Sequence, residues 1–482
     1  MAVSRGAAST TSAAAATRHL LLRTTYGLTP ELVRTVTPAR RSAWLASQLR
    51  PASVPDPVAD VVLRRLPRLA LSTPTLRAQV KAGTLDSWDV MMDLCAATIA
   101  RGLWSTRQLF EVMVELWSNH LNITCPSSEV WDNRHRYDAD VIRRHALGRY
   151  RDLLYAAVVH PAMLSYLNNT SSTKQNPNEN LGREVLELHT VGVDGGYTER
   201  DVKASALILT GLSTDWRTGA FVYRPGDHHV GRVSVMGFRH ANSSADGRAV
   251  VSAYLGYLAT HPATAQRVCR RLAVRFVGDD PPKALVDRLA RTYVKGGTAI
   301  APVLAQLFAS PEFAASAGAK IRTPYESMLA TVRALGIQPP TSGVTPLREL
   351  YWAISTVGQV PLGWPQPDGY PDVAAAWQSA GGTLARWNMN NNLANNWWPT
   401  GFRRPALTTF LPKPLPATYG ALVDAVAVRL RQFGLSTPER EAICGFFGAR
   451  PTTRLRTSSE ILTWRLGQLI ALLLDAPSHG RR

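Results

Sequence analysis

Apolar positions recur along most of the chain at three- and four-residue spacing, which is the period of a helix buried on one face. The clearest helical patterns cover residues 109–117, 141–159, 202–209, 249–276, 282–294, 303–308 and 461–474. Alternating apolar and polar positions are confined to residues 220–238, where the runs FVYRPG and RVSVMGF predict a β-hairpin across a Pro-Gly turn. The pattern therefore predicts an all-α fold, a large multi-helix body with a small β-hairpin excursion around residues 220–238.

Segments rich in proline and glycine mark the expected boundaries between parts of the chain. They lie at residues 49–57, 336–346, 358–371 and 410–416. We expect an N-terminal helical lead (1–85), a central helical body with the candidate site (86–320) and a C-terminal helical part packed on it (321–482). The first residues are rich in Ala, Ser and Thr, and they lack a twin-arginine motif and an apolar signal core. We expect a flexible leader there and a cytoplasmic protein.

Composition narrows the class of protein. A chain of 482 residues that is 45% hydrophobic can bury a substantial core, which excludes a disordered chain. No apolar run reaches the roughly 18 residues of a membrane helix, so no membrane span is predicted. The four cysteines are far apart and form no CxxC pair, which disfavours a thiolate zinc site and a disulfide framework.

The charge balance is strongly basic. Lys and Arg number 54 against 35 Asp and Glu, which gives a net charge of +19. Such a balance raises the question of a nucleic-acid partner. However, the cations are spread over the whole length, and no basic block or nucleic-acid-binding motif is visible. A basic but ordinary surface is therefore the favoured interpretation, and nucleic acid is not an expected partner.

The segment of residues 175–201, QNPNENLGREVLELHTVGVDGGYTERD, holds most of the candidate chemistry. Asn176 followed by Pro177 predicts a helix start, and Gly192 is a natural helix end. Four polar side chains between them fall on one face of this helix, at i, i+3, i+4 and i+7. They are Asn180, Arg183, Glu184 and Glu187.

This polar stripe has two interpretations, which the sequence leaves open. Two carboxylates three residues apart, with His189 nearby on the apolar side, match a metal site in a helix bundle. Alternatively, Arg183 and Glu187 form an i,i+4 ion pair within a buried network. The stripe therefore predicts either metal or acid–base chemistry, or a structural ion-pair network.

Two further histidines could complete a metal site. His120 ends an amphipathic helix in LWSNHLN, beside Asn119, and His228 follows Asp227 on a turn. Imidazoles from separate elements that converge on helix carboxylates suit Fe, Cu, Mn or Zn, among which the sequence does not distinguish. The structural alternatives are a hydrogen-bonded core histidine at 120 and a solvated histidine at 228.

The motifs together resemble the bacterial family called domain of unknown function 1800, over about four-fifths of the chain. The similar segments, in the family's order, are RHLLLRTTYGLTPE, AWLASQL, LWSNHLN, HPAMLSYLNN, PNENLGREVLELHTVGVDGGYT, HPATAQRVCRRLAVRFVGDDPP, VGQVPLGWPQPDGYPD and RWN. The family usually has His-Asp where this chain has Asp227, His228 and His229, and His228 matches the family histidine. The resemblance implies a genomic neighbour similar to sulfatases (domain of unknown function 1501) as a partner. Many relatives carry export signals, which this chain does not show.

The resemblance implies little chemistry, so the functional prediction depends on the residues. We predict a metal-dependent oxidoreductase for a small or peptide-like substrate. Its predicted metal ligands are His120, Glu184, Glu187 and His228. Its predicted catalytic residues are Arg183, Glu184, Asn180 and Asn119. His189 is the predicted cofactor ligand, since haem is a variant of this prediction. A metal-dependent hydrolase and a nonenzymatic scaffold, with the Trp-rich loop at 387–399 anchoring a partner, are the alternatives.

Overall fold

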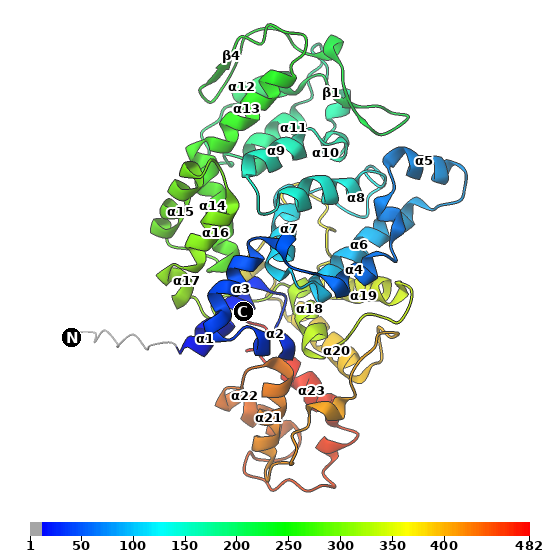
Figure 1. Cartoon of the computed structure of the whole chain (residues 1–482), viewed down its shortest axis with the longest axis vertical. Coiled ribbons are helices and arrows are strands. Elements are labelled where there is room, and N and C mark those ends of the chain that lie inside the picture. Colours follow the sequence, from blue (N-terminus) through cyan, green and yellow to red (C-terminus); the bar gives the residue numbers. More distant parts are fainter. Residues whose placement is uncertain (1–11) are drawn as a thin grey trace, which may run out of the picture.

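The computed structural model describes residues 12–482, and this part of the chain is mostly helical (Figure 1). Residues 1–11, where the flexible leader is expected, lie outside the described residues. Within 12–482 the chain forms 23 α-helices and two small two-stranded sheets. The all-α prediction is therefore confirmed.

The helices follow the chain in three groups. The first group is α1 (Ala13–Thr24), α2 (Pro30–Thr35), α3 (Arg41–Gln48), α4 (Pro57–Leu63), α5 (Thr73–Lys81), α6 (Ser87–Trp104), α7 (Gln108–His120) and α8 (Arg134–Arg136). The second is α9 (Tyr150–Val158), α10 (Pro161–Tyr166), α11 (Glu179–Glu184), α12 (Glu199–Leu209), α13 (Arg248–Thr260), α14 (Pro262–Phe276), α15 (Lys283–Lys295), α16 (Ile300–Phe308) and α17 (Pro311–Ala315). The third is α18 (Pro324–Ala334), α19 (Thr345–Thr356), α20 (Ala380–Asn395), α21 (Tyr419–Arg431), α22 (Thr437–Phe446) and α23 (Leu466–Asp475).

These helices form an elongated body around a continuous core. In Figure 1, α9–α13 and the strands lie at one end, α20–α23 lie at the other, and α6, α7, α14 and α18 lie between them. One cluster of buried hydrophobic side chains extends from Leu20 to Leu474. Helices of the three predicted parts contact one another, since α6 packs against both α4 and α19. The boundaries near residues 85 and 320 stay a prediction.

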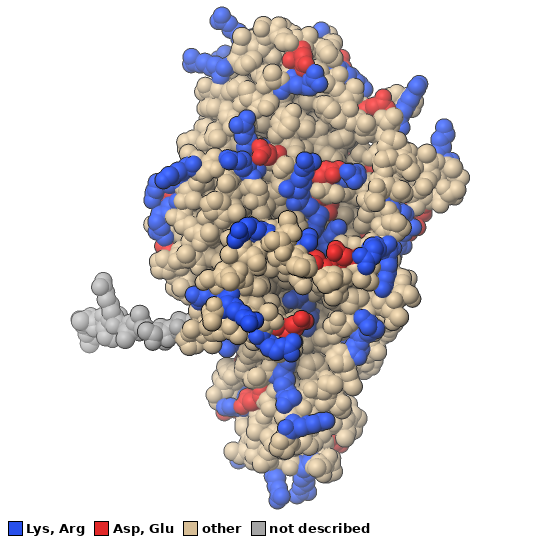
Figure 2. Space-filling model, in the orientation of Figure 1, with Lys and Arg blue, Asp and Glu red and all other residues tan. Residues whose placement is uncertain are grey.

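Two surface properties bear on the expected partners. Lys and Arg side chains are scattered over the whole visible face instead of gathering in one stripe (Figure 2). No helix within residues 12–482 combines the length and the hydropathy that crossing a bilayer would require.

The β-excursion consists of two hairpins instead of one. β1 (Leu212–Thr214) pairs with β2 (Phe221–Tyr223), and β3 (Val233–Val235) pairs with β4 (Phe238–His240), both antiparallel. The predicted hairpin of β2 with β3 across the Pro-Gly turn is wrong. Pro225 opens a 3-10 turn there, whereas Met236 and Gly237, both with positive φ, make the tight turn between β3 and β4.

Two predicted helix boundaries also differ from the structure. The helix predicted to start at Asn176 starts at Glu179, because Asn176 closes a backbone turn with Thr173 and Asn178 caps the helix instead. After Glu184 the coil widens into a π-helical turn, η6 (Val185–His189). A wider turn changes the direction of the side chains that follow. His189, the last residue of this turn, is fully buried.

The predicted helix over residues 249–276 is two helices, α13 and α14, with the break at His261-Pro262. The ring of Pro262 fits the first turn of a helix but not its interior, and the His261 side chain accepts a hydrogen bond from the amide of Ala263. One face of α14 is apolar and packs into the core, including Val268 and Leu272. The opposite face carries the arginines of the site described below.

Candidate functional site

Arg183, a predicted catalytic residue, lies in an ion-pair network between α11 and α12. Its guanidinium lies 2.8 Å from Glu199, and within α11 and η6 it also pairs with Glu179 at 3.2 Å and Glu187 at 3.4 Å. The hydroxyl of Tyr197 donates to Glu187 at 2.6 Å. Because three partly exposed carboxylates surround one guanidinium, Arg183 is not free to bind a ligand anion. This arrangement corresponds to the ion-pair interpretation of the stripe, although it is less buried than expected.

The other two members of the stripe lie beside this network. The amide of Asn180 donates to the side-chain oxygen of Asn168 at 3.4 Å. Glu184 is half-buried, and burial and then the charge of Glu187 raise the pKa of its carboxyl. The charge of Asp368 also raises it, so Glu184 is within electrostatic reach of the loop that carries Asp368. No member of the stripe lines the cavity described below.

His120 and Tyr150 form a buried hydrogen-bonded pair with the backbone of His189. The Tyr150 hydroxyl donates its one hydrogen to the His189 carbonyl, so the 2.8 Å contact with His120 Nε2 requires that nitrogen to be the donor. His120 Nδ1 is then the unprotonated nitrogen, and it is buried without a hydrogen-bond partner in residues 12–482. Burial, first of all, and the nearby Arg271 hold the pKa of His120 well below its usual range.

A second buried histidine, His189, lies close to His120. Both its ring nitrogens are buried and have no hydrogen-bond partner among the described residues. Its ring centroid lies 6.4 Å from that of His120. Burial and then the charges of Arg267 and Arg271 lower its pKa to about 3. Both histidines are therefore neutral at physiological pH and lie next to two arginines.

His228 lies in a different environment from these two histidines. Its Nδ1 is 2.9 Å from the carbonyl of Thr210, and its Nε2 is 3.0 Å from the side-chain oxygen of Asn242. The ring is fully buried against Gly247. Each nitrogen thus has a polar partner within 3.0 Å, as in a structural core histidine.

The four predicted metal ligands do not come together as one set. Over residues 12–482, no group of three or more His, Cys, Asp or Glu side chains has an arrangement that could hold a metal ion. Glu187 is bound to Arg183 and Tyr197, and His228 is held by Thr210 and Asn242. The sequence could not show this, because distances between separate elements are set only by the tertiary packing.

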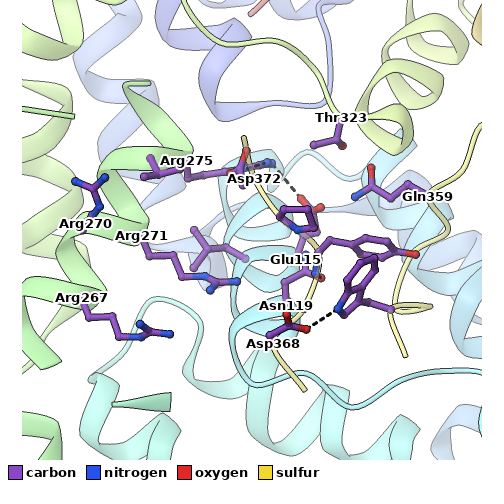
Figure 3. A pocket seen from close by; sticks show the side chains of 16 residues that line it. Glu115, Asn119, Arg267, Arg270, Arg271, Arg275, Thr323, Gln359, Asp368 and Asp372 are labelled. Carbon is purple, nitrogen blue, oxygen red and sulfur yellow. Dashed lines mark hydrogen bonds and ion pairs between the residues drawn. The ribbon is translucent and has the colours of Figure 1, made fainter. Parts of the chain in front are cut away.

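The structure instead forms a cavity of about 440 Å³ between α7, α14 and the loop after α19 (Figure 3). Asn119 on α7 is the one predicted site residue in its lining. The other polar lining side chains come from these three elements and from the start of α18. They are Glu115, Arg267, Arg270, Arg271, Arg275, Thr323, Gln359, Asp368 and Asp372.

One wall of the cavity is made of arginines on α14. Arg267, Arg271 and Arg275 follow one another at four-residue spacing, so they project from the same face of the helix. Figure 3 shows Arg267 and Arg271 reaching from α14 toward the side of Asp368 and Glu115. Within residues 12–482, Arg267 binds the Leu188 carbonyl at 3.3 Å, and Arg271 forms neither a hydrogen bond nor an ion pair. Burial, and then the charge of Arg267, lower the pKa of Arg271 to about 10.

At the floor of the cavity, Arg275 is surrounded by three carboxyls, of which Glu115 and Asp372 line the cavity. The guanidinium lies 2.6 Å from Glu326 and 3.0 Å from Glu115, and its second terminal nitrogen lies 3.6 Å from Asp372. Burial raises the pKa of Glu115 to about 7, and the charge of Arg275 offsets this only in part. Burial alone would also raise the pKa of Glu326, but Arg275 and Arg482 hold it below its usual range. Of these two carboxyls, Glu115 is therefore the one that takes a proton near neutral pH.

The loop opposite α14 is held tightly against α7. The Trp364 indole donates to Asp368 at 2.6 Å, and the side-chain oxygen of Asn119 accepts a hydrogen bond of 3.4 Å from the amide of Tyr370. Gly369 has a φ of +73°, and a Cβ there would lie 1.9 Å from the carbonyl oxygen of Asn119. Only glycine therefore allows this close approach of the loop to the end of α7.

The sequence contained two unused signals for this site. The run HPATAQRVCRRLAVRF places arginines at positions 267, 271 and 275, which is the spacing of one polar helix face. The run WPQPDGYPD combines aromatic and acidic residues on a proline-rich loop, which suggests an ordered functional loop. Neither signal shows that the two segments face each other. The cavity forms because they do.

The fold and the site together define a helical protein whose body encloses an arginine-lined cavity. The family model described as Protein of unknown function (DUF1800) matches residues 19–481, and the chain belongs to this family. The family prediction is thereby confirmed over nearly the whole chain. No curated protein and no solved structure matched this chain.

Proposed function

We propose that the protein binds a small anionic molecule in the cavity, with Arg271 and Arg267 pairing with its anionic group. The observation that carries this proposal is the state of Arg271, a cavity-lining guanidinium without a carboxylate partner in residues 12–482. A partly buried charge without a partner is costly. A carboxylate or phosphate group would supply the missing partner through charge-assisted hydrogen bonds.

The surroundings of Arg271 support an anion over a cation. Four arginines line the cavity against three carboxyls, and the two nearest histidines are held neutral, so the net charge of the lining is positive. Glu115 on the cavity floor supplies a carboxyl that can give or take a proton near neutral pH. Acid–base chemistry on the bound molecule is the reaction type that this pair of features favours.

The test is isothermal titration calorimetry of the full chain with inorganic phosphate and with acetate. We expect saturable binding that Arg271→Gln and Arg267→Gln each weaken about tenfold or more, the loss typical of one charge-assisted hydrogen bond. Arg291→Gln is the control, because Arg291 is an exposed arginine of α15 that does not line the cavity. The control separates a specific site from general attraction of anions to a chain of charge +19. Equal weakening by all three substitutions would overturn the proposal.

A metal-dependent oxidoreductase, the function predicted from the sequence, is the second candidate. One observation favours it, the three unpartnered ring nitrogens of His120 and His189 at a centroid separation of 6.4 Å. It ranks second because Arg267 and Arg271 make this location unfavourable for a cation. A hydrolase using the same metal and a haem protein with His120 or His189 as axial ligand are variants of this candidate.

Metal content decides between the two candidates. Protein purified without an affinity tag is analysed by inductively coupled plasma mass spectrometry and by absorption spectroscopy for haem. One equivalent of Fe, Cu, Mn or Zn that is lost in both His120→Ala and His189→Ala would support the second candidate. His228→Ala is the comparison, since His228 is held in its own hydrogen bonds and should leave the metal content unchanged.

A further inference from the structure

The cavity has two walls of different chemistry. α14 provides Arg267 and Arg271, and the loop opposite provides Trp364, Tyr370 and Pro371. The rings of Trp364 and Tyr370 lie with their centroids 5.0 Å apart, at an interplanar angle of 52°. A molecule that fills the cavity would therefore meet charge on one side and aromatic surface on the other.

The aromatic wall is fixed in place before any ligand arrives. The Trp364 indole is oriented by its hydrogen bond to Asp368, and the Trp364 carbonyl accepts a bond of 2.9 Å from the Asn122 amide. Tyr370 is tied through its own backbone amide to Asn119. A rigid aromatic surface loses little conformational entropy on binding, which makes it an effective contact for an apolar group.

The carboxylates of the cavity restrict the charge of the ligand. Asp368 lies on the aromatic loop, near Asn119 in Figure 3, and the charges of Asp372 and Asp368 partly offset the lowering of the Arg271 pKa. Glu115 and Asp372 lie on the floor, where Arg275 and Lys320 already pair with them. A second anionic group next to these carboxylates would be repelled. This arrangement favours a ligand with one anionic group and an uncharged remainder.

On the basis of the anion site proposed above, we propose that the ligand is a small aromatic molecule with a single anionic group. The anionic group pairs with Arg271 and Arg267, and the ring lies against Trp364 and Tyr370. A cavity of about 440 Å³ is in the range that holds small-molecule ligands. This assignment adds the ligand's class to the proposed function.

Calorimetry with benzoate and acetate tests the assignment, because the two carboxylates share the anionic group and differ in the ring. We expect the full chain to bind benzoate about tenfold or more tighter than acetate, the effect of adding aromatic contact to the same anion. Trp364→Leu should remove most of this preference, because benzoate loses a ring contact that acetate does not make. Trp352→Leu is the control, since Trp352 is an exposed tryptophan of α19 outside the cavity.

Each outcome has a defined meaning. If the native chain binds both carboxylates with equal affinity, the aromatic assignment is overturned and the anion site stands. If neither carboxylate nor inorganic phosphate binds, the anion site is overturned and the assignment with it. If Trp364→Leu fails to fold, Tyr370→Leu serves as the second variant. A benzoate preference that survives in a folded Trp364→Leu or Tyr370→Leu chain would overturn the role of the aromatic wall.

Discussion

Arg271 and Arg275 lie one turn apart on α14, yet only Arg275 is paired with carboxylates. Arg275 contacts Glu326 and Glu115 at 2.6 and 3.0 Å, whereas Arg271 faces the cavity. The same residue type thus has a structural role at one position and a proposed binding role at the next. The two roles predict opposite effects on stability and binding.

Removing Arg275 should destabilise the fold. Arg275→Leu leaves the buried Glu115 and Glu326 without their shared partner, and a buried pair broken on one side costs about 3–5 kcal/mol. The free energy of unfolding from urea titration measures this loss. In contrast, Arg271→Gln removes an unpaired charge, so without ligand it should leave stability unchanged or raised. Equal destabilisation by both substitutions would show that Arg271 has a structural partner after all.

Glu115 should contribute a loss of stability as pH rises from about 4.5 to about 7, opposite in sign to the contribution of the buried histidines, whose pKa values are lowered. The folded state raises the pKa of Glu115 from 4.5 to about 7, so over this range this carboxyl binds more protons in the native state than in the unfolded state. Burial raises the pKa of Asp475 to about 7 as well, with the same sign. In Glu115→Gln, the unfolding free energy at pH 8 relative to that at pH 5 should therefore be higher than in the native chain. Asp475→Asn should raise this relative value independently, and an unchanged value in both variants would contradict these shifts.

Gly369 should be far less tolerant of substitution than a glycine with similar backbone geometry in open space. Gly369→Ala adds a Cβ that would lie 1.9 Å from the Asn119 carbonyl oxygen, so the cavity loop must move away from α7. Gly343 is the matched control, because its φ of +64° is similar and a Cβ added there would have no atom within 4 Å. We expect Gly343→Ala to cost about 1 kcal/mol. Gly369→Ala should cost more and also weaken phosphate binding, and equal effects of the two substitutions would argue against a tightly held loop.

Arg183→Met should have a small effect on stability. Its ion-pair network is partly exposed, and such pairs contribute about 1 kcal/mol or less. Because Arg183 does not line the cavity, the affinity for inorganic phosphate should stay the same. Calorimetry and urea unfolding on the same variant measure both quantities. A loss of phosphate binding with the fold intact would indicate that the binding site includes the polar stripe of α11.

The sequence by itself determined the helical fold class and the family. It also indicated, for several single residues, whether the side chain lies on a polar or an apolar helix face. Helical spacing of apolar residues is a local property, because one buried face suffices to produce it. The spacing of Arg267, Arg271 and Arg275 is likewise a local property, so the sequence could have predicted that they share one polar helix face. The position of His189 near the apolar side was also readable, and the structure buries it fully.

Only the tertiary structure decided which of these residues meet. Helix periodicity placed Arg183 and Glu187 on one face but could not show that Glu199 of the next helix would complete their network. Likewise, nothing local indicates that Asn119 on α7 would contact Tyr370, which is 251 residues away. Such contacts depend on how whole helices pack, and packing energy is shared among many side chains along the chain. The candidate site therefore moved from a stripe on one helix to a cavity between three elements.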